Sequence, residues 1–111
     1  MVTIFEQGDI IAIDFDPQTG HEQKGRRPAL VVSNNAYNQF TKAAMVCPIT
    51  HTNKNIPVQI ALDNRTKTTG VIMCEQIKAL DLSKRCATFL EKAPADIIAD
   101  VVDMVFSFIE I

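Results

Sequence analysis

Short apolar runs separated by turn residues fill the first ninety positions of this 111-residue chain. Most have the length and the β-branched content of strands. None approaches the roughly 20 apolar residues that a membrane-spanning helix needs. A series of short strands predicts a small β-barrel rather than a parallel sheet, and the length predicts a single domain over residues 1–111. The expected strands are residues 9–15, 28–33, 43–50, 58–62, 70–74, 77–80 and 87–90.

The C-terminal segment has a different period. Residues from Pro94 to about Ile109 carry one narrow polar stripe at helical spacing, and nearly everything else there is apolar. One barrel face cannot cover so wide an apolar surface, so we expect part of this helix to bury against a second subunit. A deeply packed terminal helix explains the pattern comparably well. Residues 34–40 are expected to form a short helical turn or loop.

Composition excludes several other classes of protein. The N-terminus has neither a basic segment nor an apolar run, so no signal peptide is expected and the cytoplasm is the default location. The odd number of cysteines and the absence of a CxxC motif favour free thiols over a disulfide or a zinc site. We therefore predict no metal, and buried free thiols at Cys47, Cys74 and Cys86.

Positive charge is concentrated in the middle of the chain. The net charge is −2, but residues 21–67 carry seven Lys or Arg against two acids, which is +5 for that segment. Because phosphate contacts need Lys and Arg, the segment is compatible with RNA binding. An ordinary solvated surface would explain it almost as well.

The polar stretch 16–27 (DPQTGHEQKGRR) is long enough for a functional loop and leads directly into an apolar strand. Pro28 fixes the backbone beside Arg27, so we expect a rigid guanidinium there. Preorganised positive charge is what the stabilisation of a phosphate or an oxyanion requires. On spacing alone, however, a charged and solvated loop is the commoner explanation.

Three blocks in order make the chain resemble the PemK/MazF toxins: residues 16–28 (DPQTGHEQKGRRP), 46–50 (VCPIT) and 68–81 (TTGVIMCEQIKALD). The resemblance implies an SH3-like, CcdB-like small antiparallel barrel with a C-terminal helix, acting as a homodimer. It also implies metal-independent cleavage of single-stranded RNA at short sequence contexts. The ribose 2′-OH would attack the neighbouring phosphorus, leaving a 2′,3′-cyclic phosphate and a 5′-OH.

The resemblance also assigns the site residues. Arg27 would stabilise the phosphorane electrostatically, because guanidinium is a poor proton shuttle, and Thr50 would hydrogen-bond the same phosphate. Glu22 would act as a base or orient Arg27, and His21 would transfer a proton or contact a nucleobase. Substrate-binding roles are expected for Gln23, Lys24, Arg26, His51, Glu75 and Gln76.

The chain departs from the pattern at two positions. Met73 stands where the PemK branch has an arginine, and His51 stands where many MazF members have a second threonine. The implied partners are single-stranded RNA and a cognate antitoxin with an acidic, disordered tail. A non-catalytic toxin like the CcdB proteins that bind gyrase is the alternative, and a non-toxic interaction module is a third.

Overall fold

The computed structural model describes residues 3–15 and 25–111, and they form a seven-stranded antiparallel sheet with helices around it. The mostly β fold with a C-terminal helix that the sequence predicts is thereby confirmed. In chain order the elements are β1 (Asp9–Asp14), β2 (Arg26–Val31), α2 (Asn35–Thr41), β3 (Ala44–Thr50), β4 (Gln59–Ala61), β5 (Val71–Met73), η1 (Cys74–Gln76), β6 (Lys78–Leu80), η2 (Leu82–Lys84), β7 (Thr88–Lys92) and α3 (Ala95–Ser107).

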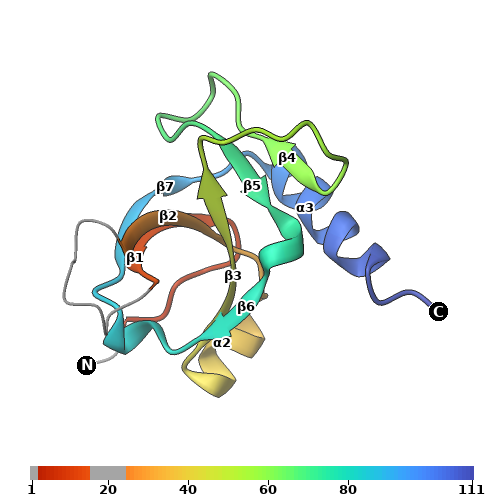
Figure 1. Ribbon diagram of the computed structural model, residues 1–111. Coiled ribbons are helices and arrows are strands. Elements are labelled where there is room, and N and C mark those ends of the chain that lie inside the picture. The colour runs from red at the N-terminus through yellow and green to blue at the C-terminus, as the bar shows by residue number, and fades with distance from the viewer. Residues whose placement is uncertain (1–2, 16–24) are drawn as a thin grey trace.

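The sheet curls into an open barrel (Figure 1). Its strand order is β4-β5-β3-β2-β1-β7, and β6 pairs with the first half of β3 off this path. Over the residues that the structure describes, β4 and β7 are not hydrogen-bonded to each other, so the two ends of the sheet leave a seam. Strands β2 and β3 are the two central strands of this order, and they pair with each other.

Strand β3 changes its neighbour part-way along. Residues Ala44–Val46 pair with β6, whereas Ile49 and Thr50 pair with β5. Pro48 lies between these two pairings, at a point where the missing N–H of proline removes no ladder bond to β5 or β6. The strand therefore continues through the proline and ends at Thr50.

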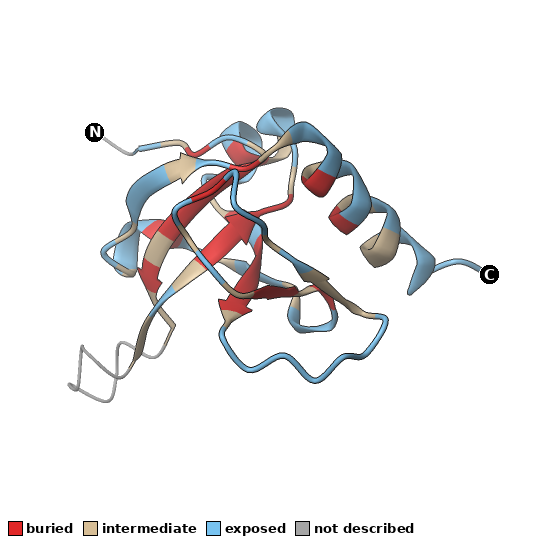
Figure 2. Cartoon of the chain, turned by 90° about the horizontal axis from the view of Figure 1, so that it is seen from above, coloured by how far each residue is buried: buried red, intermediate tan, exposed pale blue. Residues whose placement is uncertain are grey.

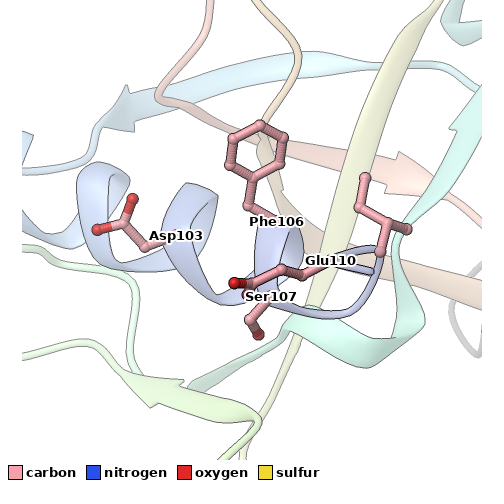
Figure 3. A pocket seen from close by; sticks show the side chains of 5 residues that line it. Asp103, Phe106, Ser107 and Glu110 are labelled. Carbon is pink, nitrogen blue, oxygen red and sulfur yellow. The ribbon is translucent and has the colours of Figure 1, made fainter.

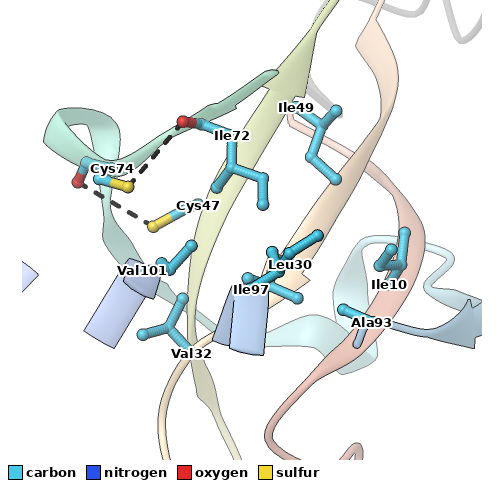
Figure 4. Close-up of a cluster of buried hydrophobic side chains, with 10 residues drawn as sticks. All are labelled: Ile10, Leu30, Val32, Cys47, Ile49, Ile72, Cys74, Ala93, Ile97 and Val101. Carbon is cyan, nitrogen blue, oxygen red and sulfur yellow. Dashed lines mark hydrogen bonds between the residues drawn. The ribbon is translucent and has the colours of Figure 1, made fainter. Parts of the chain in front are cut away.

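The apolar residues of β2 are buried on both sides of the sheet, as their continuous run predicts. Because side chains alternate along a strand, Ala29 and Val31 point into one apolar cluster while Leu30 and Val32 point into another. Figure 4 shows the second cluster, in which Leu30 faces α3. Figure 2 shows the buried residues along the central strands and on the inner side of that helix. The central strands are thus held between two layers of side chains.

Helix α3 begins at Ala95, with Pro94 at the N-cap position just before it rather than at the first helical position that the sequence suggests. Ile97 and Val101 are buried against the sheet, and the partly buried side chains beside them extend the contact. Beyond them the apolar side chains emerge into solvent: Phe106 is 69% exposed and Ile109 is 70% exposed. The helix is therefore only half covered by its own sheet. No helix in the described part of the chain is long and apolar enough to cross a membrane.

Two of the three cysteines are buried, and the expectation for the third is wrong. Burial, with a contribution from Glu75, raises the pKa of Cys47 to about 12 and that of Cys74 to about 11, so both stay as neutral thiols that fill the core. Cys86 is exposed. Its φ of 51° belongs to a left-handed turn after η2, and this turn carries the side chain out of the sheet.

A carboxylate from β7 holds the loop between β4 and β5. Glu91 accepts hydrogen bonds from the backbone N–H and the hydroxyl of Thr68, at 2.7 and 2.8 Å, and from the backbone N–H of Lys67 at 3.1 Å. Partial burial alone would raise the pKa of Glu91, but these donors lower it below its ordinary value. The loop is thereby fixed across the seam of the barrel.

We expect Glu91→Gln to lower the melting temperature by several degrees at pH 7. An amide can accept at only one of its two terminal atoms and brings an N–H against a backbone donor. A carboxylate with a depressed folded-state pKa stabilises the fold at neutral pH, and this contribution is lost as the pH falls through that pKa. The difference between the two proteins should therefore shrink as the pH falls below the ordinary pKa of a glutamate. Melting curves at pH 7, 5 and 3 measure this.

Asp100→Asn is the matched control, because Asp100 is exposed on α3 and makes no ion pair to a described residue. A Glu91→Gln protein with the same pH dependence as wild type would contradict the role given to this carboxylate.

Candidate active site

A pocket of about 350 Å³ opens at one end of the paired strands β2 and β3. It lies where β2 begins and β3 ends, and the loop before β5 completes its wall. No acidic side chain is among the described residues that line it. These residues are Arg26, Arg27, Pro28, Ile49, Thr50, His51, Thr52 and Thr69.

Arg27 and Thr50 are brought together by the register of the two strands. Ala29 pairs with Pro48 at the end of the β2–β3 ladder, and Arg27 and Thr50 each stand two residues beyond that pair, where both line the pocket. On its other side Arg27 pairs with Ile13 of β1, so the backbone that carries the guanidinium belongs to an interior strand. Its side chain is exposed and can reach an anion from solvent.

Arg26 and Arg27 have different surroundings because adjacent residues of a strand point to opposite faces. The guanidinium of Arg26 forms an ion pair with Asp14 at 3.2 Å, the residue directly opposite it on β1, and donates to the hydroxyl of Thr88 at 3.1 Å. Among the described residues, Arg27 forms no ion pair. Both residues line the pocket, but Arg26 is tied to the barrel wall whereas the guanidinium of Arg27 is left for a ligand.

The Thr50 hydroxyl is oriented by the backbone that follows it. The N–H of Thr52 donates to Thr50 Oγ1 over 3.2 Å, so the hydroxyl proton of Thr50 remains to be donated to a bound anion. Gly70 packs directly against this turn. A Cβ at Gly70 would lie 2.4 Å from the Thr50 carbonyl oxygen, and its φ of +121° is one that L-residues seldom adopt. Only glycine lets β5 approach the end of β3 so closely.

His51 extends the same end of β3. Its Nε2 lies 2.8 Å from Thr69 Oγ1, which is within hydrogen-bonding distance. Thr69 belongs to the loop that Glu91 holds through Thr68. The imidazole is exposed but fixed at one nitrogen, and it lines the pocket beside Thr50.

The structure brings together four of the ten predicted site residues: Arg27, Thr50, Arg26 and His51. Glu75 and Gln76 are exposed on η1 and are not among the described residues that line this pocket. The remaining four, His21, Glu22, Gln23 and Lys24, lie outside the described residues.

Three neighbours of the site were missed by sequence reasoning: Thr52, Thr69 and Gly70. Thr69 and Gly70 fall within the 68–81 block, but nothing in the sequence indicates that they meet Thr50 and His51. Their contact depends on β5 pairing with the end of β3. No group of three or more His, Cys, Asp or Glu side chains that could hold a metal ion is found in the described part of the chain.

Comparison with known proteins places this geometry in a family. Residues 6–108 match the family described as PemK-like, MazF-like toxin of type II toxin-antitoxin system. The chain belongs to this family. Endoribonuclease PemK of Escherichia coli is 35% identical over 100 residues, covering 86% of this chain and 75% of the relative. The endoribonuclease toxin MazF of E. coli strain K12 is 37% identical over 83 residues, covering 75% of this chain and 74% of the relative.

Solved structures agree with the assignment to the PemK-like, MazF-like family. The crystal structure of MazF (Form-I) from Deinococcus radiodurans superposes with a TM-score of 0.84 at 38% identity, and 96% of each chain is covered. A chain from the MazE-MazF (Form-II) crystal structure of the same organism gives a TM-score of 0.83 at 31% identity, with 98% of each chain covered. The open barrel with its C-terminal helix is thus the fold of this family.

We expect Gly70→Ala to destabilise the protein and to displace Thr50. The strained φ alone costs about 1–3 kcal/mol, and the added methyl must push against a backbone carbonyl. Urea unfolding measures the stability, and amide chemical shifts of residues 50–52 report the displacement.

Gly8→Ala is a matched control, because Gly8 also has a positive φ of 93° but its Cβ would meet the flexible Ile98 side chain. It should lose stability without moving those amides. Unchanged amide shifts in a folded Gly70→Ala protein would contradict the proposed contact.

Proposed function

We propose that the pocket at the junction of β2 and β3 is the active site of a toxin endoribonuclease that cleaves single-stranded RNA at short sequence contexts. The ribose 2′-OH attacks the adjacent phosphorus, the bond to O5′ breaks, and the products are a 2′,3′-cyclic phosphate and a 5′-OH. As the family resemblance implies, the proposed reaction is independent of metal: the nucleophile is the substrate's own hydroxyl, and protein side chains stabilise the charge that develops on phosphorus. DNA lacks that hydroxyl and is not a substrate.

The observation that carries the proposal is that Arg27 and Thr50 line one pocket from two directly paired strands. The phosphorane formed by 2′-OH attack carries more negative charge on its non-bridging oxygens than the starting phosphodiester does. Arg27 contributes a guanidinium that can donate to two oxygens at once, and Thr50 contributes a hydroxyl donor. Both are placed before the charge develops, which is the condition for electrostatic catalysis.

Arg26 supports the same chemistry from the pocket wall. Its ion pair with Asp14 keeps the first residue of β2 fixed to β1, and this holds the strand from which Arg27 projects. Its positive charge still contributes to the attraction of RNA phosphates.

The family resemblance supports roles for further residues that are not among the described residues of the pocket. His21 and Glu22 act on protons or orient Arg27, and Gln23 and Lys24 contact the RNA from the same loop. Glu75 and Gln76 on η1 contact RNA that extends beyond the pocket. RNA as substrate supports action in the cytoplasm, where messenger RNA is translated.

The gyrase-binding alternative is not favoured. A protein that only binds gyrase needs neither a cationic pocket nor a threonine hydroxyl beside the arginine, so this alternative does not explain the pocket. The relatives that cover most of this chain carry the name endoribonuclease.

We expect Arg27→Ala to lower the cleavage rate by roughly 10²–10³-fold, the usual cost of losing one preorganised donor to a developing anion. The assay incubates a long mixed-sequence RNA with the protein in EDTA and maps the 5′-OH and cyclic phosphate ends. A 2′-deoxy substitution at a mapped site should abolish cleavage there.

Lys42→Gln is the charge-matched control. Lys42 precedes β3 and so lies at the opposite end of that strand from Thr50. It should retain full activity. Cleavage by Arg27→Ala at the wild-type rate, or wild-type cleavage that stops in EDTA, would exclude the proposed mechanism.

The exposed half of α3 supports a homodimer. A shallow depression of about 540 Å³ there is lined by Asp103, Phe106, Ser107, Ile109 and Glu110 (Figure 3). Large apolar side chains that are mostly exposed beside one another mark an interaction surface in a soluble protein. The homodimer implied by the family resemblance would cover the part of the helix that its own sheet leaves open.

We expect the wild-type chain to sediment with the mass of two chains at micromolar concentration. The double variant Phe106→Ser, Ile109→Ser should sediment as a monomer, because it removes the apolar area that drives association. Phe40→Ser is the control, since Phe40 is 91% exposed on α2 and should leave the mass unchanged. A double variant that remains dimeric would place the interface elsewhere.

The second partner we propose is an antitoxin, since the family is that of toxins of type II toxin-antitoxin systems. An acidic disordered tail would bind the cationic pocket as RNA does. Competition between a polyanionic tail peptide and RNA measures this, and simultaneous binding of both at full affinity would refute it.

A further inference from the structure

The reaction proposed above moves two protons, one from the 2′-OH and one to the departing O5′. Few of the described pocket residues can take part. A guanidinium does not release its proton in proteins, and threonine hydroxyls are far too weak as acids. Imidazole is the side chain whose charge changes near neutral pH. His51 is the pocket residue of that type in the described part of the chain.

One hydrogen bond holds the His51 ring, and the segments on both sides of that bond are themselves held. His51 follows Thr50, whose backbone is packed against Gly70, so the end of β3 cannot shift freely. Its Nε2 lies 2.8 Å from Thr69 Oγ1. Thr69 in turn adjoins Thr68, which Glu91 holds by two hydrogen bonds. An exposed histidine without such contacts would sample many rotamers, whereas this ring is anchored at one nitrogen.

The anchored nitrogen leaves the other one for a substrate. Among the described residues, Nδ1 of His51 makes no hydrogen bond. In the protonated ring both nitrogens are donors, so Nε2–H donates to Thr69 while Nδ1–H can point to a bound phosphodiester. The charged groups facing this end of the pocket are Arg26 and Arg27 of β2.

We propose, building on the endoribonuclease function above, that His51 is the general acid that protonates the leaving O5′. As O2′ forms its bond to phosphorus, the P–O5′ bond breaks and its electron pair passes to O5′. That oxygen takes the proton from Nδ1 of His51. The ring is left neutral, still bonded to Thr69, and regains a proton from water. Arg27 and Thr50 hold the non-bridging oxygens throughout, and a separate base accepts the 2′-OH proton.

The test compares two RNA oligonucleotides that span one mapped cleavage site. One has the natural 5′-oxygen at the scissile bond, and the other has sulfur there, a leaving group that departs without protonation. We expect His51→Ala to lower kcat on the oxygen substrate by about 10²–10⁴-fold, the usual contribution of general acid catalysis. On the sulfur substrate the same variant should be within a few-fold of wild type.

Arg27→Ala gives a different signature in the same assay, because the phosphorane charge must be stabilised whichever atom leaves. It should be slow on both substrates. Thr69→Val keeps the shape of the loop but removes the anchor of the ring, so we expect a smaller loss that is confined to the oxygen substrate. Circular dichroism and melting curves verify that each variant is folded.

Two outcomes overturn the assignment of His51. One is an equal loss by His51→Ala on both substrates, which would indicate binding or positioning rather than proton donation. The other is full activity of His51→Ala on the oxygen substrate. Either result would leave the endoribonuclease function standing, provided that wild type cleaves and Arg27→Ala cleaves far more slowly. Failure of the wild-type protein to cleave any RNA would instead remove the proposed function itself.

Discussion

Pairing between β2 and β3 is the contact on which both the core and the pocket depend. The apolar segment of β2 is buried on both faces, so the sheet is held between two clusters of side chains. The ladder that pairs Ala29 with Pro48 also brings Arg27 and Thr50, each two residues beyond that pair, to one pocket. A shift of one residue would turn Leu30 and its neighbours to the wrong faces, and it would also separate the guanidinium from the hydroxyl. Stability and site geometry are therefore set by the same hydrogen bonds.

Two adjacent arginines show how the alternation of side chains along a strand gives neighbouring residues different contacts. Arg26 forms an ion pair with Asp14 and a hydrogen bond to Thr88, so its charge is largely neutralised within the barrel. Arg27 also lines the pocket, but it is exposed and forms no ion pair to a described residue, so its charge is left for a bound anion. Amino-acid composition does not distinguish the two arginines, and two adjacent arginines in an irregular loop would not be assigned to different faces. The strand separates them because successive side chains leave a β-strand on opposite sides.

The parts of the structure that the sequence predicts well are those encoded locally. Period-two runs, the continuous apolar run of residues 28–33 and the helical stripe after Pro94 each depend on near neighbours, and the strands and helix appear within a few residues of where they were expected. Arg27 and Thr50 were identified because they stand beside recognisable strand ends within matching blocks.

The parts that escaped prediction depend on contacts between distant segments. Cys86 looked like a core thiol because Ala87 and the strand after it are apolar, but a left-handed turn exposes it. The hydrogen bond between His51 and Thr69 spans 18 residues, and the bonds of Glu91 to the β4–β5 loop span more than 20. No local pattern marks a carboxylate that will bond to a loop from the far edge of the sheet.

The open seam of the barrel makes the loop between β4 and β5 sensitive to movement of β7. The two edges of the seam are joined by side chains rather than by a backbone ladder: Glu91 of β7 accepts hydrogen bonds from Thr68, and Arg65 of the same loop pairs with Asp96 of α3. Such side-chain contacts are easier to displace than a row of backbone hydrogen bonds. A movement of β7 away from the β4–β5 loop would therefore also shift Thr69 and the His51 imidazole that is bonded to it. The central strands can keep their pairing while this happens. Chemistry can thus be lost in this chain well before its fold is.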